Sequence, residues 1–361
     1  MSDFTDYDVH LGNTGIKVSA SMDILTNSTR IKSKINKYAL LRQVQTVLDG
    51  DDFAVSSCQK MHGNFANVMR SGDDAYFTGI ITCKSIWLCP VCAERIICDR
   101  IGQLKDALSS GYKTAMVTVT LRHDKSDRLG DLLRSLKDAI RKLKSGRWWS
   151  NYKDRWGVVA YVSSYEITWG DVNGWHPHAH ILLFLDCDQV DVDLMWSELV
   201  SKYVDIVSKL GGYASRHHSV DVSQGDDRVK DYLIKHVTVD DGLALEMSST
   251  DTKDGRSNYS KTFWDLVYLS KYFGYAADLI KEYAHATYRL QSMIWSRGAK
   301  DVLGVTDPDD DDKDDDQLVA LIPRPTWSVI RTHAMQDYVL QLAVMGDDQL
   351  KEFLGSLQDK T

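Results

Sequence analysis

Three histidines stand at alternate positions in residues 175–185, WHPHAHILLFL, and a run of large apolar residues follows them at once. Successive side chains of a β-strand point to opposite faces, so His176, His178 and His180 would share one face of a sheet. Imidazoles spaced in this way converge on one point, which is how proteins usually hold a metal ion. The pattern predicts a strand that carries a metal site; a polar strand end with coincidental histidines is the alternative.

A predicted hairpin decides whether a carboxylate joins these imidazoles. Residues 170–174, GDVNG, are typical of a turn between two strands. If Trp169 faces Trp175 across the turn, Glu166 faces His178 and both side chains lie on one side of the sheet. A carboxylate beside two imidazoles suits a divalent cation. We favour this register, which makes Glu166 the third ligand.

A two-residue turn at Asn173-Gly174 would give a different register, because Asn-Gly is a strong hairpin signal in its own right. Glu166 would then point to the other face of the sheet. An H-x-H pair alone is not specific, since it also occurs in metallo-hydrolase barrels and in cupins. A (β/α)8 barrel needs about 250 residues of repeating βα units, and no such repeat follows the histidine strand.

Four of the six cysteines are grouped in a way that predicts a zinc site. Cys89 and Cys92 lie on a tight C-x-x-C knuckle, and Cys83 and Cys58 lie upstream of it. Four thiolates, or three thiolates and an imidazole such as His62, complete a closed tetrahedral Zn²⁺ site. We choose the four thiolates as the ligands of a structural zinc ion.

The other interpretations of the cysteines are weaker. A thioredoxin-like redox pair at Cys89 and Cys92 would need a strand that leads directly into the knuckle, and none is predicted there. Free buried thiols are the remaining alternative. Cys98 follows the start of a predicted helix, and we expect it to pack in the core.

Charge is unevenly placed along the chain. The net charge is −8, but residues 307–316 alone hold eight aspartates and one lysine, so the rest of the chain is nearly neutral. Residues 122–155 hold eleven Lys and Arg against five Asp and Glu. Local sign decides phosphate attraction, so this stretch could contact DNA or be a solvated helix face. The same two possibilities hold for the helical spacing of Arg134, Lys137, Arg141 and Lys144.

Aromatic residues interleave with cations at the end of this basic stretch, and they could stack on bases or pack in the core. They are Trp148, Trp149, Tyr152 and Trp156.

No apolar run approaches the roughly 20 residues that a membrane span needs. The N-terminus, MSDFTDYDVH, is acidic and polar, unlike a signal peptide. We therefore expect a cytoplasmic protein.

A tyrosine nucleophile is the next candidate. Tyr232 and Lys235 are three residues apart on a predicted helix over 228–236, so they are neighbours on one helix face. A phenol with a pKa of about 10 is a poor nucleophile until it loses its proton. A divalent cation that polarises a phosphate, with a lysine to offset developing charge, would suit phosphoryl transfer. Tyr268 and Lys271 fit the same spacing.

Several stretches together resemble the HUH endonucleases, and specifically the plasmid rolling-circle replication initiators (Rep proteins). The resemblance runs in order from about residue 58 to residue 304. Its pieces are TCKSIWLCPVC at 82–92, VTVTL at 117–121, EIT at 166–168, GWHPHAH at 174–180, the Tyr232-x-x-Lys235 helix and WSRGAKDVLG at 295–304.

The resemblance implies an activity and assigns the site residues. His178 and His180 would bind Mg²⁺ or Mn²⁺, with Glu166 as the acidic third ligand and His176 as an extra histidine without an assigned role. Tyr232, in preference to Tyr268, would attack one strand at a plasmid origin and become linked to the 5′-phosphate. The freed 3′-OH would prime a host polymerase, and a later transfer would close the circle. Single-stranded and origin DNA and a host helicase or polymerase are the implied partners.

The sequence departs from this family at one position. Some relatives carry a glutamate one helical turn before the tyrosine, where it activates water to terminate replication; here that residue is Arg228. Asp231 should lie about 100° around the helix from Tyr232, so we do not assign it to this role.

We expect an α+β fold: a central antiparallel sheet bears the histidine strand, and helices pack mainly on its other face. Helices are expected over 129–144, 192–210, 263–290 and 327–357, the last with a break at Gly346. The predicted segments are an N-terminal arm (1–57), a cysteine and zinc-binding region (58–100), the HUH nickase domain (101–304), an acidic linker (305–317) and a helical C-terminal segment (318–361), for which self-association is one open role.

Two other functions remain as alternatives. A relaxase or transposase would use the same HUH chemistry on a transfer origin or a transposon end. A non-catalytic, zinc-containing DNA-binding regulator would use the histidines structurally.

Overall fold

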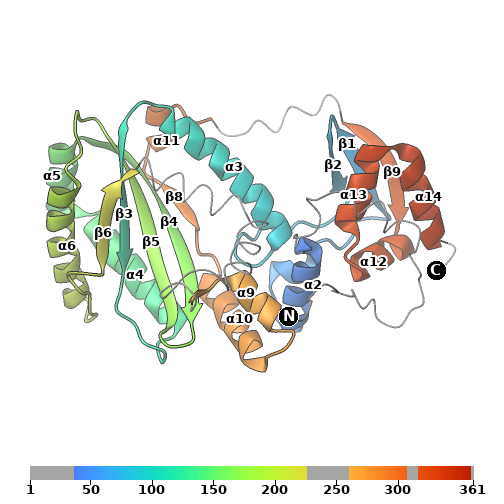
Figure 1. The fold of residues 1–361 in the computed structure, drawn as a ribbon, viewed down its shortest axis with the longest axis horizontal. Helices are drawn as coiled ribbons and strands as arrows, with labels where there is room; N and C mark the ends of the chain where they lie inside the picture. The colour runs from blue at the N-terminus through green and yellow to red at the C-terminus, as the bar shows by residue number, and fades with distance from the viewer. Residues whose placement is uncertain (1–35, 226–259, 307–315, 359–361) are drawn as a thin grey trace, which may run out of the picture. The chain divides into compact units, whose positions relative to one another are not determined.

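The computed structural model describes residues 36–225, 260–306 and 316–358. The chain divides into two compact units that interleave along the sequence. Of the described residues, the larger unit contains 40–60, 80–225 and 260–306, and the smaller unit contains 36–39, 61–79 and 316–358. Each unit has its own sheet (Figure 1).

The larger unit is built on a six-stranded sheet with the strand order β6-β3-β5-β4-β7, and β8 also pairs with β4. Every pairing in this sheet is antiparallel. The strands are β3 (Lys113–Thr120), β4 (Val158–Gly170), β5 (Gly174–Leu185), β6 (Val220–Gln224), β7 (Ser260–Lys261) and β8 (Met293–Trp295). The prediction of an α+β protein with a central antiparallel sheet is confirmed.

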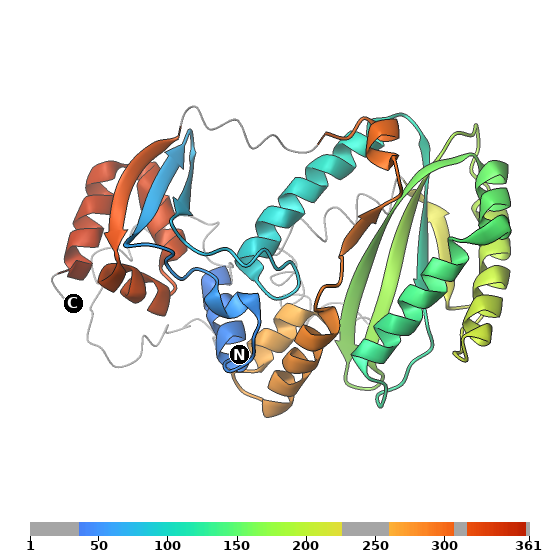
Figure 2. The same ribbon diagram turned by 180° about the vertical axis from the view of Figure 1, so that it is seen from behind.

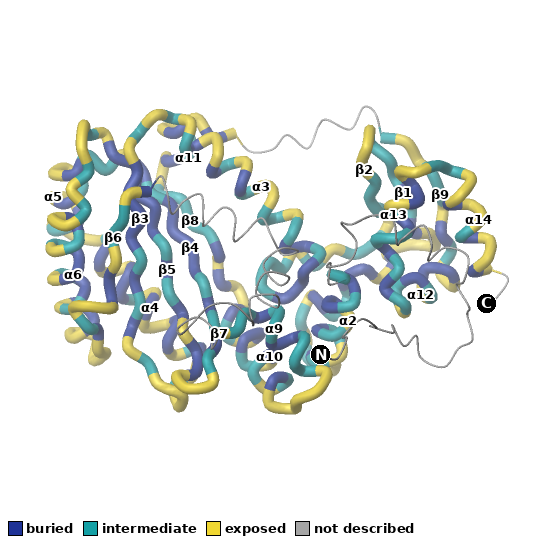
Figure 3. Tube along the Cα trace, viewed as in Figure 1, coloured by how far each residue is buried: buried dark blue, intermediate teal, exposed yellow. Residues whose placement is uncertain are grey.

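The histidine strand β5 lies in the middle of the sheet, between β3 and β4. Its second half, residues 181–185, is buried on both faces, which explains why its apolar run is continuous and does not alternate. Figure 3 shows the largely buried course of β3, β4 and β5.

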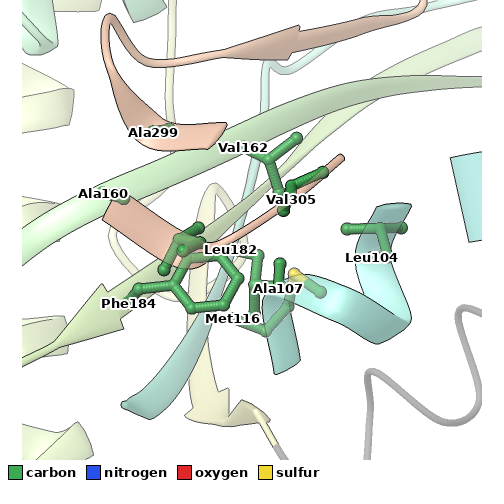
Figure 4. Packing of buried hydrophobic residues seen from close by; sticks show 10 residues of the cluster. Leu104, Ala107, Met116, Ala160, Val162, Leu182, Phe184, Ala299 and Val305 are labelled. Carbon is green, nitrogen blue, oxygen red and sulfur yellow. The ribbon is translucent and has the colours of Figure 1, made fainter. Parts of the chain in front are cut away.

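Helices cover the two faces unequally (Figures 1 and 2). On one face, Leu104 of α3 and Ala299 of α11 pack against Val162, Leu182 and Phe184 of the sheet (Figure 4). On the other face, Trp149 of α5 packs against Tyr161, and α4, α6, α9 and α10 also lie on that side. These helices are α3 (Pro90–Leu108), α4 (Leu129–Leu143), α5 (Gly146–Trp156), α6 (Val192–Lys209), α9 (Phe263–Leu269), α10 (Gly274–Thr287) and α11 (Ala299–Leu303).

Local sequence explains where several of these helices begin and end. Thr262 and Asp265 form a reciprocal capping box that starts α9. Gly157, with φ of +63°, ends α5 in the left-handed conformation that glycine favours. The helices predicted over 129–144, 192–210 and 263–290 are confirmed, the last as α9 and α10.

The smaller unit contains a three-stranded antiparallel sheet that the sequence did not predict. Strand β9 pairs with β1, which pairs with β2. Helices follow β9, and Gly346 ends the second of them, as predicted. The elements are β1 (Phe65–Ser71), β2 (Asp74–Thr78), β9 (Gln317–Pro323), α12 (Arg324–Thr332), α13 (Gln336–Met345) and α14 (Asp347–Gln358).

Two short elements complete the described structure before the cysteines: α2 (Lys37–Val47) and a 3₁₀ turn (Ala54–Ser57). None of the described helices is both long and apolar enough to cross a membrane.

Candidate functional site

The register of the β4–β5 hairpin brings a carboxylate to the histidines. Trp169 pairs with Trp175 and Glu166 pairs with His178, as the longer loop requires. The alternative register, which a two-residue turn at Asn173-Gly174 would give, is therefore wrong. Gly174 closes the loop with φ of +73°, and a Cβ there would lie 2.9 Å from the Cα of Lys125. Glycine thus permits both the backbone conformation and the close approach.

Glu166, His178 and His180 form a compact group, which we call the triad. The Nε2 atoms of His178 and His180 lie 2.9 and 3.0 Å from the same oxygen of Glu166, Oε2. The three ligand atoms lie within 4.8 Å of one another. All three side chains are half-buried, so an ion or a phosphate could reach them. Two imidazole nitrogens and a carboxylate oxygen could hold a divalent metal ion.

The carboxylate of Glu166 supplies the negative charge of the triad. Burial raises the pKa of Glu166, but the hydrogen bonds from His178 and His180 outweigh this effect and hold the pKa well below its ordinary value. The carboxylate is therefore ionised at neutral pH, which a cation ligand needs to be.

His176 lies beside the triad and outside it. Its ring centroid is 5.3 Å from that of His178 and 4.7 Å from that of His123. Nδ1 of His123 donates to the carbonyl oxygen of Asn173 at 3.0 Å. Burial lowers the pKa of His176 to about 4, so its imidazole is neutral at neutral pH.

The four predicted zinc ligands also come together. Sγ of Cys58 lies 3.6 Å from Sγ of Cys89 and 3.8 Å from Sγ of Cys92, and Sγ of Cys83 lies 3.7 Å from Sγ of Cys92. Four sulfurs bound tetrahedrally at about 2.3 Å from Zn²⁺ would be about 3.8 Å apart. The spacing therefore fits a zinc ion.

Helix α3 starts inside this cluster. Cys89 is its N-cap residue, and Sγ of Cys89 accepts a hydrogen bond from the backbone N–H of Cys92 at 3.4 Å. Hydrogen bonds from the other three thiols hold the pKa of Cys92 well below its ordinary value. A thiolate is the form that binds a metal.

The long interval between Cys58 and Cys83 holds the β1–β2 hairpin, which belongs to the smaller unit. The chain on either side of this excursion is paired: Gln59 N–H donates to the Ile81 carbonyl at 2.7 Å, and Ile81 N–H donates to the Lys60 carbonyl at 2.8 Å. This pairing brings Cys58 and Cys83 together despite their separation in sequence.

Two expectations about neighbouring residues change. Cys98 is exposed, so the prediction that it packs in the core is wrong. It lies about 120° around α3 from the centre of the stripe that Ile101, Leu104 and Ala107 bury. His62 is exposed and lies outside the group of sulfurs, so the four-thiol set is the one that the structure assembles.

Several residues of the basic stretch make contacts within the protein. Arg134 and Arg141 pair with Asp131 and Asp138 on the surface of α4. Lys144 donates to the Ser163 hydroxyl at 2.9 Å, and burial lowers its pKa to about 8. Trp149, Tyr152 and Trp156 are buried. The core interpretation therefore holds for these three aromatics, on the face of the sheet opposite the triad.

Three residues of the predicted nicking chemistry lie outside the described residues. They are the nucleophile Tyr232, Lys235, and Arg228, which replaces the glutamate that some relatives carry. Tyr268, the competing tyrosine, is described: it lies on α9, and the Lys271 ammonium is 5.7 Å from its ring centroid.

Comparison with known proteins bears on this site. Residues 76–191 match a family described as replication protein. The resemblance to the plasmid replication initiators is confirmed. The matched segment contains the triad and three of the four clustered cysteines.

Two proteins from Streptomyces are similar to part of this chain. The chain is 31% identical over 137 residues to "Protein rep" of Streptomyces lividans, which covers 30% of each protein. It is 29% identical over 135 residues to "Neomycin resistance protein" of Streptomyces cyanogenus, which covers 30% of this chain and 31% of that protein. The aligned region thus spans about a third of the length of these relatives. No solved structure matches the chain significantly.

Proposed function

We propose that this replication protein nicks one DNA strand at a plasmid origin and later rejoins it, with the fold and chemistry of the HUH endonucleases. The observation that carries the proposal is the triad: an ionised carboxylate and two imidazoles gathered on one sheet face, inside the segment that matches the replication protein family. In this proposal residues 101–304 are the nickase domain, and residues 58–100 are the zinc-binding region.

Glu166, His178 and His180 would hold Mg²⁺ or Mn²⁺. A divalent cation bound there supplies Lewis acidity and neutralises charge on the scissile phosphate. Glu166 contributes the negative charge that retains the cation, and the two histidines contribute neutral nitrogen donors. Because the carboxylate lies between both imidazoles, it also fixes the direction in which they present Nε2.

Tyr232 is the proposed nucleophile. Once its phenol has lost its proton, the oxygen attacks the phosphorus, a new O–P bond forms and the bond from phosphorus to the 3′-oxygen breaks. The products are a 5′-phosphotyrosine and a free 3′-OH, which can prime a host polymerase. Lys235, three residues after Tyr232 in the sequence, would offset the developing negative charge.

The cysteine cluster would hold a structural Zn²⁺ that joins the start of α3 to the chain at Cys58. We expect the protein to act in the cytoplasm on single-stranded origin DNA, with a host helicase and polymerase as partners.

A covalent-adduct assay tests the proposal. The full chain is incubated with Mn²⁺ and single-stranded oligonucleotides that tile the plasmid origin, labelled at the 3′ end, because the protein should stay on the downstream fragment. We expect a labelled adduct on a denaturing gel for the wild type and none for Tyr232→Phe. Tyr268→Phe is the control, because it removes the tyrosine of the other Y-x-x-K sequence. This variant should form as much adduct as the wild type.

The outcomes distinguish the alternatives. Full adduct formation by Tyr232→Phe would reject Tyr232 as the nucleophile. Adduct on a transfer origin or a transposon end, and not on the replication origin, would favour a relaxase or a transposase. Origin binding without adduct would favour a regulator.

A further inference from the structure

We propose that Thr118 positions His180 for cation binding by switching its hydroxyl between hydrogen-bond donor and acceptor. This inference rests on the metal centre of the proposed function and assigns a role to part of the VTVTL motif that the nicking chemistry leaves unexplained. Thr118 touches neither the expected cation nor the DNA in this account; it acts through the imidazole of His180.

The geometry places two threonines of β3 beside the histidine strand. Thr118 pairs with His180, and Thr120 pairs with His178. The Thr118 hydroxyl lies 3.0 Å from Nδ1 of His180. The Thr120 hydroxyl donates instead to the carbonyl oxygen of Pro177 at 3.1 Å. Only Thr118 therefore contacts the ring of a proposed ligand.

The two nitrogens of His180 must exchange roles when a cation binds. In the structure Nε2 faces the ionised Glu166 at 3.0 Å, and since a carboxylate only accepts, Nε2 carries the proton. Nδ1 then has a lone pair and accepts from the Thr118 hydroxyl. A bound cation needs the lone pair of Nε2, so the proton must sit on Nδ1 and be donated to the Thr118 oxygen.

A hydroxyl can serve both states, because it donates or accepts as its O–H rotates. A backbone carbonyl at this place could support only the cation-bound tautomer, and an ammonium group only the cation-free one. A valine would have the same shape and the same preference for a strand, but it would leave Nδ1 of His180 without this partner. The hydroxyl, and not the β-branched shape, is what the geometry assigns to Thr118.

The second imidazole lacks such a partner. Nδ1 of His178 is buried and makes no hydrogen bond within the described part of the chain. Among the described residues, the hydroxyl of Thr118 gives His180, and not His178, a partner that can follow its proton from one nitrogen to the other. We therefore expect the affinity of the triad for a cation to depend on Thr118 more strongly than on Thr120.

Metal titration of the full chain without DNA provides the first test. Mn²⁺ binding is followed by electron paramagnetic resonance for the wild type and three variants. Thr118→Val should weaken binding by about 10- to 100-fold, the usual effect of removing a hydrogen-bond partner of a metal ligand. Thr118→Ser restores the hydroxyl and should bind within about threefold of the wild type. Thr120→Val makes the same change two residues away on the same face and should also bind within about threefold.

The wild-type protein provides a second test that needs no variant to fold. ¹⁵N NMR of the histidine side chains reports which nitrogen carries the proton. His180 should be protonated on Nε2 without metal and on Nδ1 after saturation with Mg²⁺. The same tautomer in both states would overturn the proposal, as would wild-type Mn²⁺ affinity in Thr118→Val or a Thr118→Ser variant as weak as Thr118→Val.

Failure of the proposed function looks different. If Glu166→Gln, His178→Ala and the wild type all bind Mn²⁺ equally, the triad is not the metal centre. If only the triad variants lose Mn²⁺ and Thr118→Val does not, the metal centre stands and the role of Thr118 is wrong.

Discussion

Oε2 of Glu166 lies 2.9 Å from Nε2 of His178 and 3.0 Å from Nε2 of His180, so one oxygen accepts from both imidazoles. Such sharing concentrates the negative charge of the carboxylate where the two Nε2 atoms converge. A cation that replaces the two imidazole protons would keep all three ligands close to their present positions. At the scale of single residues, the charge of Glu166 is therefore the property to test.

Glu166→Gln keeps the shape of the side chain and removes its charge. We expect the Mn²⁺ affinity of the full chain to fall at least about tenfold, because a neutral amide is a poorer ligand for a hard cation. Isothermal titration calorimetry measures the change. Glu352→Gln, at an exposed position of α14, is the matched control and should bind Mn²⁺ as the wild type does. Equal affinity in both variants would show that Glu166 is not a ligand.

Lys144 gives a prediction for pH dependence. Burial lowers its pKa from 10.5 to about 8, so the native protein loses this proton at about pH 8 while the unfolded chain keeps it to about pH 10.5. Between these two pH values the unfolded chain binds more protons than the native protein. The contribution of Lys144 to the free energy of unfolding therefore rises with pH in this range. The rise should be about 1–3 kcal/mol, since the Tyr161 ring at 4.6 Å partly stabilises the ammonium.

Urea unfolding of the wild type and Lys144→Met at pH 7.5 and pH 10 isolates this contribution. The stability of the wild type relative to the variant should increase with pH. A constant difference between the two proteins would mean that Lys144 is not desolvated in the native state.

At the scale of elements, the β4–β5 hairpin sets the register on which the triad depends. Gly174→Ala would place a Cβ 2.9 Å from the Cα of Lys125 at a residue with positive φ. We expect a loss of about 1–3 kcal/mol in the free energy of unfolding. Urea unfolding followed by circular dichroism measures it.

Gly130→Ala is the matched control for that substitution. Gly130 lies in α4, and a Cβ there would meet nothing within 4 Å. Replacing this helical glycine should raise the free energy of unfolding by about 0.5–1 kcal/mol. Equal effects of the two substitutions would contradict the strain that we assign to Gly174.

The elements that could be predicted are those with local signals. The alternation in β3 and β4, the apolar run of β5 and the helical spacing in α4 are each visible within a dozen residues. The hairpin register could also be predicted, because only the longer loop brings Glu166 to the histidines. Cys98 was misplaced because neither a helix start nor a cysteine indicates which side of the helix is buried.

The smaller sheet could not be predicted in the same way. Strand β1 pairs with β9, about 250 residues later in the chain, and β2 has only five residues. The acidic run before β9 indicates a linker and gives no sign of the strand that follows. A pairing between segments so distant in sequence depends on the rest of the fold, which no short window of sequence contains.

At the scale of the whole molecule, the cysteine cluster lies where the chain leaves the larger unit and returns to it. Cys58 precedes the excursion that begins after Lys60, and Cys83 follows the return at Ile80. A zinc ion held there would stabilise the larger unit, because a metal that binds only the folded protein adds its binding free energy to the stability.

Cys89→Ser should therefore lose about one equivalent of zinc and lower the Tm of the larger unit by about 10 °C, since several kcal/mol of folding free energy depend on the metal. Elemental analysis and calorimetry measure the two effects. Cys98→Ser, on the same helix but exposed and outside the cluster, should retain zinc and Tm. Zinc retained at full occupancy in Cys89→Ser would reject the site.

The most direct test of the account is to identify the residue that becomes attached to DNA. After reaction with origin oligonucleotide and Mn²⁺, the adduct is digested with nuclease and trypsin and examined by mass spectrometry. We predict a nucleotide linked through its 5′-phosphate to Tyr232, in the tryptic peptide DYLIK at 231–235. This adduct should not form when Mn²⁺ is chelated or when Glu166 is replaced by Gln. An adduct on another residue, or one formed equally well without the metal and without Glu166, would contradict the account.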